Sequence, residues 1–207
     1  MIINKFKNKK VLITGHTGFK GSWLTLFLKI AGAKIMGISL KPSTKPSFFK
    51  AINLSKGIRN NYINILNRRK LENKIISFKP DFIFHLAAQP LITEAYTKSF
   101  LTWETNLIGT INILEIIKKL KKSCTCVLIT SDKCYENIEK RSGYKETDRI
   151  GGSDPYSASK ASAEIAIKSY FQSFFIKSNH RIATARAGNV VGGGDWNYGR
   201  IIPDCMF

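Results

Sequence analysis

Tyr156 and Lys160 lie four positions apart, so in a helix their side chains point the same way, one turn apart. The spacing of apolar residues predicts a helix over residues 157–175, which places the pair at its start. An ammonium beside a phenol stabilises the phenolate and lowers the pKa of the tyrosine, which becomes a base for a hydroxyl proton as hydride leaves the same carbon. This spacing also arises by chance on surface helices, so the interpretation depends on the surrounding residues.

A glycine-rich loop provides the first support. Gly15, Gly18 and Gly21 have the G-x-x-G-x-x-G spacing of a dinucleotide-binding loop. The first glycine permits a tight turn, the second lets the backbone approach a pyrophosphate, and the third lets the next helix pack closely. The helix N-terminus then offers N–H groups and a positive dipole end to the phosphates. Placement between a strand and a helix favours this interpretation over an ordinary turn.

The second predicted strand bears on the choice of dinucleotide. NAD-binding proteins usually carry an acidic residue at the end of this strand. Here the strand ends at Ser39, and Lys41 follows. A serine with a nearby lysine could accept a 2′-phosphate, so the residues alone leave NAD and NADP both open.

Strands that alternate with helices must position these residues. Short apolar runs predict strands at residues 11–13, 34–39, 81–87, 126–130 and 183–187. Helical spacing predicts helices at residues 22–30, 107–120 and 157–175. Strands that are apolar on both faces predict a doubly wound parallel α/β sheet, the Rossmann arrangement. The irregular segment 136–155 leads directly to Tyr156.

Composition describes an ordinary globular chain. Its 207 residues are 43% hydrophobic and 23% charged, which predicts one folded domain. The net charge of +19 comes from 33 Lys and Arg against 14 Asp and Glu. The lysines are scattered, so we expect a solvated basic surface and no nucleic-acid or membrane partner. The positive field would help to attract a dinucleotide and a diphosphate sugar.

Cysteine and histidine usage suggests a reduced compartment and no metal site. The four cysteines have no C-x-x-C spacing, and no signal-peptide or membrane-span pattern is present, so we expect free thiols and a cytoplasmic protein. The three histidines are far apart in the sequence, which predicts no metal. His16, inside the glycine loop, could face the pyrophosphate or the solvent.

The glycine loop, Ser131 after a predicted strand and the Tyr156/Lys160 pair together resemble the extended short-chain dehydrogenase/reductase family that acts on sugar nucleotides. Segments 85–89, 106–110 and 186–192 are similar to further motifs of that family. The resemblance is greatest to its CDP-glucose 4,6-dehydratase branch, through residues 15–23, 87–90, 130–137, 151–157, 185–190 and 192–196. Ser131-Asp132-Lys133 discriminates most, because dTDP-glucose dehydratases typically have Thr-Asp-Glu there.

The resemblance implies an internal redox elimination with NAD as cofactor and a nucleotide diphosphate sugar, CDP-glucose, as substrate. Tyr156 would deprotonate the C4 hydroxyl as C4 hydride passes to NAD, with Ser131 bonded to the same oxygen and Lys160 tuning the phenol. Loss of the C5 proton and of the C6 hydroxyl as water would follow, and the hydride would return to C6. The acid position maps to Asp132 and the base position to Lys133. A lysine base needs burial or a nearby cation; otherwise Lys133 orients substrate or stabilises the enolate.

The resemblance also implies two sets of binding residues. Cofactor contacts map to Gly15, Thr17, Gly18, Phe19, Lys20, Gly21, Ser39, Asn64, Ile65, Leu86, Ala87, Ala88, Gln89, Asn106, Thr130, Tyr156, Lys160 and Ala187. Substrate contacts map to Gln89, Ser131, Asn189 and Arg200. Asn64-Ile65 stands where relatives commonly have an Asp-Ile pair that contacts adenine, so adenine recognition is weakened or uses the Asn64 side chain.

Family members continue well beyond position 207 into a smaller substrate-binding lobe. The resemblance therefore divides the chain into a Rossmann domain with the catalytic residues, 1–190, and the start of that lobe, 191–207, most of which is missing. Relatives often pair through helices like those predicted at 107–120 and 157–175, so a homodimer is also expected.

Three functions stay open at this point. The chain is the catalytic half of a dehydratase, a cofactor-binding module without its own turnover, or a nucleotide-sugar 4-epimerase. The epimerase shares Tyr156 and Lys160 but needs no acid for elimination. Asp132 with Lys133 argues against it.

Overall fold

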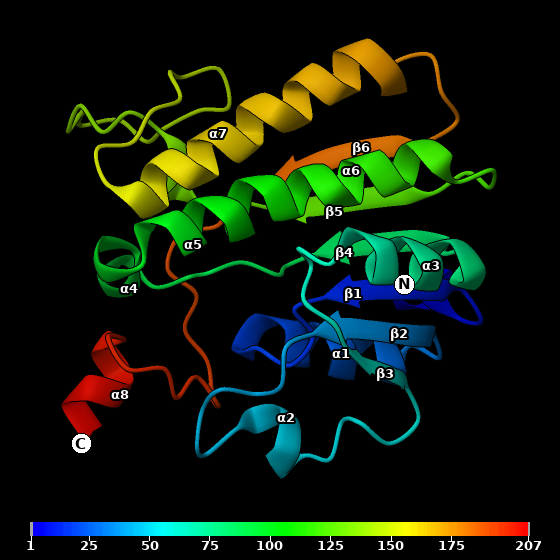
Figure 1. Ribbon diagram of the computed structural model, residues 1–207. Helices are drawn as coiled ribbons and strands as arrows, with labels where there is room; N and C mark the ends of the chain where they lie inside the picture. The colour runs from blue at the N-terminus through cyan, green and yellow to red at the C-terminus, as the bar shows by residue number, and fades with distance from the viewer. Residues whose placement is uncertain (1, 207) are drawn as a thin grey trace.

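A computed structural model describes residues 2–206, which form a parallel sheet of six strands in the order β3-β2-β1-β4-β5-β6 (Figure 1). The strands are β1 Lys10–Thr14, β2 Lys34–Ser39, β3 Arg59–Tyr62, β4 Phe82–His85, β5 Thr125–Ile129 and β6 Arg181–Ala185. All neighbouring pairs are parallel. The chain builds outward from β1 to β3, returns to β4 on the other side of β1, and continues to β6. The predicted doubly wound fold is confirmed, and the order reverses between β1 and β4.

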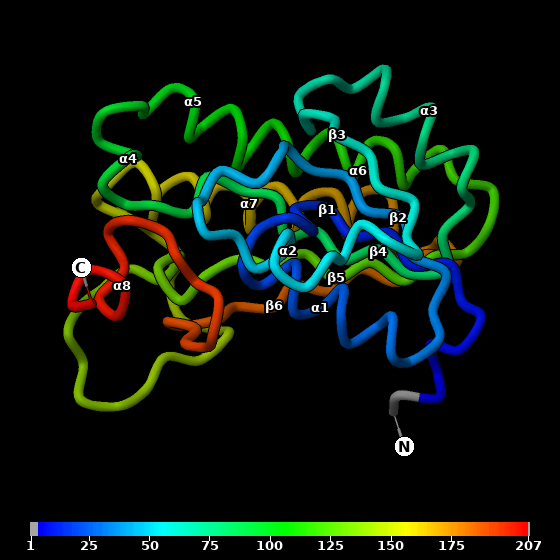
Figure 2. The backbone as a smooth tube through the Cα atoms, turned by 90° about the horizontal axis from the view of Figure 1, so that it is seen from below, coloured from blue at the N-terminus to red at the C-terminus, as the bar shows by residue number. Residues whose placement is uncertain are grey.

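Helices cover both faces of the sheet. They are α1 Phe19–Ile30, α2 Phe48–Ala51, α3 Arg68–Phe78, α4 Ile92–Thr97, α5 Ser99–Trp103, α6 Gly109–Lys119, α7 Pro155–Tyr170 and α8 Ile201–Met206. Figure 2 shows α3, α5 and α6 on one side of the strands and α1 on the other. Two π-helical turns extend the long helices: η2, Glu104–Ile108, joins α5 to α6, and η4, Phe171–Phe175, follows α7. Two short 3-10 helices are η1, Ile2–Phe6, and η3, Asp132–Cys134.

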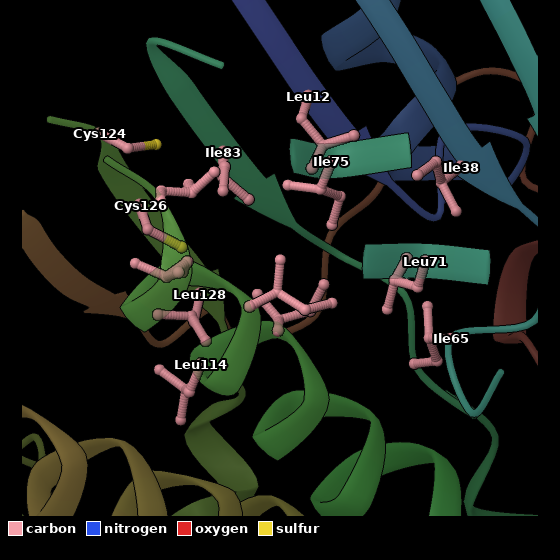
Figure 3. Packing of buried hydrophobic residues seen from close by; sticks show 14 of the residues in the cluster. Leu12, Ile38, Ile65, Leu71, Ile75, Ile83, Leu114, Cys124, Cys126 and Leu128 are labelled. Carbon is pink, nitrogen blue, oxygen red and sulfur yellow. The ribbon is translucent and has the colours of Figure 1, made fainter. Parts of the chain in front are cut away.

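The sheet divides the hydrophobic core in two, because successive strand residues point to opposite faces. Leu12 of β1 belongs to the larger cluster, with Ile75 of α3 and Leu114 of α6 (Figure 3). Val11 and Ile13, its neighbours in β1, belong to a smaller cluster with Leu28 of α1. Cover on both faces accounts for the unbroken apolar runs of the central strands.

Five strands lie within two residues of their predicted ends, which confirms them. The prediction missed β3 because its sequence, Arg-Asn-Asn-Tyr, is polar, and β3 lies at an edge of the sheet. The helix predicted at 107–120 is longer, since α5, η2 and α6 form one continuous element from Ser99 to Lys119. Between residues 2 and 206, no helix has both the length and the apolar character that crossing a lipid bilayer requires.

Candidate active site

The loop between β1 and α1 is built on three glycines. Gly15 has a φ of +74°, and a Cβ there would lie 2.7 Å from the backbone nitrogen of Ala87. A Cβ on Gly21 would lie 2.0 Å from the carbonyl oxygen of Gly15. Gly18 is the N-cap of α1, and no side chain caps the first-turn N–H groups, which leaves them available to an anion. These are the turn, the close packing and the open approach that a dinucleotide loop needs.

Gly21→Ala is expected to destabilise the chain by about 1–3 kcal/mol, because the added methyl group overlaps a backbone carbonyl. The free energy of unfolding in urea measures this change. Gly143→Ala is the matched control, since a Cβ at Gly143 would meet nothing within 4 Å. Equal stabilities of the two variants would contradict the packing described for Gly21.

His16 lies beneath the loop, fully buried, with its Nε2 2.6 Å from Oδ1 of Asn60 in β3. Gly37 of β2 provides the space, because a Cβ there would lie 2.3 Å from the imidazole ring. Burial lowers the pKa of His16, against the effect of its hydrogen bond to Asn60. The sequence analysis expected the His16 side chain to face either the pyrophosphate or the solvent, and both expectations are wrong. The ring instead anchors the loop to β2 and β3.

Hydroxyl groups tie the same loop to the end of β2. The Thr17 Oγ1 lies 2.8 Å from the Ser39 Oγ and donates to the carbonyl oxygen of Leu40 at 2.9 Å. The adjacent side chain of Ser39 is half-buried. Ser39 is the last residue of β2, and its predicted contact with the cofactor stays a prediction.

Asn64 and Ile65, expected near adenine, follow the end of β3. The Asn64 Oδ1 accepts the backbone N–H of Leu66 at 2.9 Å, so this oxygen stabilises its own turn. Ile65 is buried in the larger core cluster and packs against Gly109, where a Cβ would lie 2.4 Å from its Cδ1. The adenine contact stays a prediction.

Gln89, in the loop after β4, is held entirely by protein groups. Its Nε2 donates to Oγ1 of Thr102 at 2.9 Å and to the carbonyl oxygen of Leu91 at 3.0 Å. Its backbone N–H donates to Oδ1 of Asn106 at 2.8 Å, and Nδ2 of Asn106 donates to Oγ of Ser159 at 2.9 Å. Gln89 and Asn106 thus fix the loop against η2 and α7.

His85, at the end of β4, joins three elements through its ring. The Nδ1 lies 2.7 Å from Oγ1 of Thr14, and the Nε2 lies 3.2 Å from Oγ1 of Thr110 in α6. Burial lowers the pKa of His85 to about 3, so the ring is neutral. The half-buried residues that follow it are Leu86, Ala87 and Ala88.

A pocket opens at the carboxyl edge of the sheet. Its wall includes Phe19, Lys20, Thr130, Ser131, Asp132, Lys133, Tyr156, Ala187, Gly188, Asn189 and Arg200. The structure thus brings together four of the five predicted catalytic residues, and Lys160 lies buried behind them. Among the described residues, 2–206, no three His, Cys, Asp or Glu side chains converge to hold a metal ion.

Tyr156 lies in the first turn of α7, whose N-cap is Asp154. The Asp154 Oδ1 accepts the backbone N–H groups of Tyr156 and Ser157 at 2.9 and 3.0 Å, which fixes the start of the helix. The Tyr156 hydroxyl is hydrogen-bonded to the Ser131 side chain. Burial raises the pKa of Tyr156, while this hydrogen bond and the charge of Arg200 act in the opposite direction.

The expected lowering of the pKa of Tyr156 by Lys160 is therefore wrong for this structure. Lys160 extends toward β5, where its Nζ donates to the carbonyl oxygen of Ile129 at 3.4 Å. Burial, together with the positive charge of Lys20, lowers the pKa of Lys160 itself to about 8. The helix places Tyr156 and Lys160 on one face, as predicted. The Tyr156 hydroxyl nevertheless bonds to Ser131, while the Lys160 ammonium bonds to the carbonyl oxygen of Ile129.

The pKa of Lys160 predicts how stability changes with pH. Between about pH 8 and the ordinary value of 10.5, the unfolded chain holds this proton and the folded chain releases it, so stability rises with pH. The shift corresponds to about 3 kcal/mol over that window. We expect Lys160→Met to remove this part of the rise, measured as free energies of unfolding in urea at both ends of the window. An unchanged rise would contradict the assignment.

Asp132 and Lys133 begin η3 and are exposed at the pocket. The backbone N–H of Asp132 donates to the carbonyl oxygen of Ala187 at 3.1 Å, which joins the segments after β5 and β6. The Ser131 hydroxyl donates to Oδ1 of Asp132 at 3.0 Å and accepts the backbone N–H of Lys133 at 3.2 Å. The described residues do not bury Lys133, so they do not supply the burial that a lysine base needs.

A part-buried ion pair that the sequence analysis missed joins α7 to the segment after β6 behind the pocket. Glu164 of α7 accepts from Arg186 through Nε at 3.0 Å and Nη2 at 3.2 Å, and it also accepts from the Thr130 hydroxyl. The Arg186 guanidinium lies 4.6 Å from the centre of the Tyr135 ring. The available signal was the position of Glu164, four residues after Lys160 on the buried face of the helix.

Comparison with known proteins assigns the family. The sequence model described as GDP-mannose 4,6 dehydratase matches residues 12–190. The chain belongs to the GDP-mannose 4,6-dehydratase family. It is 44% identical to a CDP-glucose 4,6-dehydratase of Salmonella typhimurium over 98% of this chain and 58% of that protein.

Solved structures of two epimerases share the fold of this dehydratase-family chain. An epimerase from Methanothermobacter thermautotrophicus matches with a TM-score of 0.82 and 25% identity, over 98% of this chain and 58% of the other. A UDP-glucose 4-epimerase from Thermus thermophilus, in complex with NAD, matches with a TM-score of 0.76 and 26% identity, over 88% and 56%. The chain thus spans less than two thirds of the length of each of these relatives.

Proposed function

We propose that this chain is the NAD-binding and catalytic portion of a CDP-glucose 4,6-dehydratase, with residues 1–190 as the Rossmann domain and 191–207 as the start of the substrate lobe. One observation carries the proposal: Ser131, Asp132 and Tyr156 line one pocket at the sheet edge that also bears the glycine loop. The 44% identity to a CDP-glucose 4,6-dehydratase supports the choice of substrate.

The residues present fit a dinucleotide. Side chains at Gly15 and Gly21 would fill the loop, and the uncapped start of α1 is suited to a pyrophosphate. The 26% identical epimerase structure contains NAD, which supports the same cofactor here. When bound, NAD would supply a reversible hydride acceptor.

The chain's own residues would move the protons. Tyr156 takes the proton of the C4 hydroxyl, and Ser131, already bonded to the phenol, orients that oxygen. Because burial raises the pKa of Tyr156, the phenol needs positive charge nearby, and Arg200 provides some of it. Asp132 protonates the C6 hydroxyl as it leaves as water. Lys133 removes the C5 proton in its neutral form, which requires that bound substrate and cofactor bury it, since the described residues leave it exposed. Return of the C4 hydride to C6 and of a proton to C5 would then give a 4-keto-6-deoxy sugar nucleotide.

The pocket favours a dehydratase over an epimerase. Both reactions use a tyrosine base, but only elimination needs an acid and a second base. Asp132 and Lys133 line the pocket together with Tyr156, which supports their assignment as the acid and the second base. An incubation of the purified chain with CDP-glucose and NAD tests the function through the ultraviolet absorbance of the keto product in alkali. NAD binding without product would favour the cofactor-binding module.

Lys133→Met tests the role of the lysine. We expect the variant to reduce bound NAD with CDP-glucose but to block exchange of the C5 proton with solvent deuterium, since the base is removed. Mass spectrometry of the recovered sugar measures the exchange. Lys140→Met, in the next loop, serves as a control for loss of a lysine. Unimpaired exchange in Lys133→Met would remove this residue from the mechanism.

We also propose that the chain forms a homodimer in the cytoplasm. Apolar side chains are exposed on α5, η2, α7 and η4: Phe100 at 75%, Ile108 at 45%, Ile165 at 59% and Phe174 at 49%. These elements pack side by side, so the exposed groups can form one surface for a second copy. Four free cysteines suit a reducing compartment.

A further inference from the structure

Among the described residues, the strands β1 to β3 and their loops, which form the expected adenosine end of the dinucleotide site, carry no carboxylate. Residues 1–71 contain 15 Lys and Arg and no Asp or Glu, and the first acidic residue is Glu72. Glu72 lies on α3, where it pairs with Lys119 at 2.7 Å. The strands β1 to β3 and the loops between them therefore offer no group of the kind that selects NAD, an acid that binds the ribose 2′-hydroxyl and repels a 2′-phosphate.

The two acidic residues that line the catalytic pocket, Asp132 and Asp195, are engaged there and not at the end of β2. Asp195, in the segment after β6, lines the catalytic pocket and not the end of β2. Its Oδ1 accepts from Nδ2 of Asn197 at 2.8 Å, and its Oδ2 lies 3.8 Å from Nε of Arg200. Asp132 lies with it in that pocket, hydrogen-bonded to Ser131. These contacts hold both carboxylates at the sugar end of the site.

Ser39 can serve either form of the ribose. Thr17 donates its proton to the carbonyl oxygen of Leu40, so the 2.8 Å contact between the two hydroxyls has Ser39 as donor. The Ser39 oxygen then has lone pairs left to accept a ribose 2′-hydroxyl. A hydroxyl group can rotate, and in its other orientation Ser39 donates to a phosphate oxygen. A carboxylate has no proton to donate in this way.

Lys41 adds positive charge at the same position. It is exposed two residues beyond Ser39, on the loop that continues from the end of β2. A lysine ammonium on a flexible stem binds phosphate as a point charge without fixed geometry. The end of β2 thus combines the Ser39 hydroxyl, which can donate or accept a hydrogen bond, with the Lys41 ammonium, and it carries no carboxylate.

We propose that this site accepts NADP as well as NAD, with Ser39 and Lys41 as the residues that set this tolerance. The inference rests on the proposed function, because it concerns the cofactor of that same site. A dehydratase that returns its hydride within each turnover can use either dinucleotide, since the 2′-phosphate is remote from the reacting ring.

Calorimetric titration of the full chain with NAD⁺ and with NADP⁺ tests the proposal. We expect the two dissociation constants to differ by less than about tenfold, because no like charge opposes the 2′-phosphate. Lys41→Gln should weaken NADP⁺ by about fivefold and leave NAD⁺ unchanged. Lys34→Gln, which removes the same charge from the opposite end of β2, should change neither. Ser39→Asp should weaken NADP⁺ by about 100-fold, and retained NAD⁺ binding shows that the variant is folded.

Two results would overturn the inference. They are NADP⁺ binding that is weaker than NAD⁺ binding by more than about tenfold in the unaltered chain, and equal NADP⁺ affinities of the unaltered chain and Lys41→Gln. Both leave NAD⁺ binding, and with it the proposed function, intact. Failure to bind either dinucleotide would instead overturn the proposed function together with this inference.

Discussion

Tyr156→Phe is expected to slow formation of the keto sugar from CDP-glucose by about 10²–10⁴-fold, the usual contribution of a positioned proton-transfer group. The variant keeps the ring, which packs in the pocket wall, and removes the hydroxyl that is hydrogen-bonded to Ser131. Binding of NAD should persist, because the glycine loop and the start of α1 are untouched. Rates of product formation at saturating substrate, with a separate NAD titration, measure both effects.

Tyr96→Phe is the matched control for this loss. Tyr96 lies in α4, 67% exposed and outside the pocket wall, so removal of its hydroxyl should leave the rate unchanged. If Tyr156→Phe retained the rate of the unaltered chain, another group would be the C4 base, and the pocket would need a new assignment.

Glu164→Ala is expected to destabilise the chain by about 2–4 kcal/mol, because it leaves the part-buried Arg186 guanidinium without its counter-ion. Glu164 also accepts the Thr130 hydroxyl, so the substitution releases the end of β5 beside Ser131. The free energy of unfolding in urea measures the loss. A rate that falls together with stability would show that the ion pair also positions the pocket.

Two further variants separate the ion pair from a general loss of charge. Glu146→Ala removes an exposed glutamate and should change stability by less than about 0.5 kcal/mol. The double variant Glu164→Leu with Arg186→Met should recover part of the loss, because no charge is then left unpaired in the interior. Equal stabilities of Glu164→Ala and Glu146→Ala would contradict the role of the ion pair.

Sequence patterns predicted the parts of the fold that depend on local chemistry. Val11 to Ile13 are apolar because both faces of β1 are covered, and Gly15 and Gly21 stand where a side chain would overlap backbone atoms. The sequence prediction missed β3 because its residues include Asn60, which accepts a hydrogen bond from His16. Hydrophobic patterns do not register such a role. Periodicity finds residues that bury apolar surface and not those that complete a polar contact.

The parts of the site that were not predicted depend on contacts between distant segments. The ring of His16 turns inward because Gly37, in the neighbouring strand, leaves room for it. The Tyr156/Lys160 spacing correctly predicted that both lie on one helix face. It did not predict that the Lys160 ammonium extends toward β5 and donates to the carbonyl oxygen of Ile129. The directions of these side chains depend on how strands and helices pack together. They cannot be predicted from residue spacing along one helix.

Isotope tracing tests the central claim, that this pocket moves a hydride from C4 to C6 of one sugar. The full chain is incubated with NAD and CDP-glucose deuterated at C4, and the product is analysed by mass spectrometry and nuclear magnetic resonance. The account predicts a 4-keto-6-deoxy product that carries the deuterium at C6. Deuterium retained at C4 of an epimerised sugar, or bound NAD with no product at all, would contradict it.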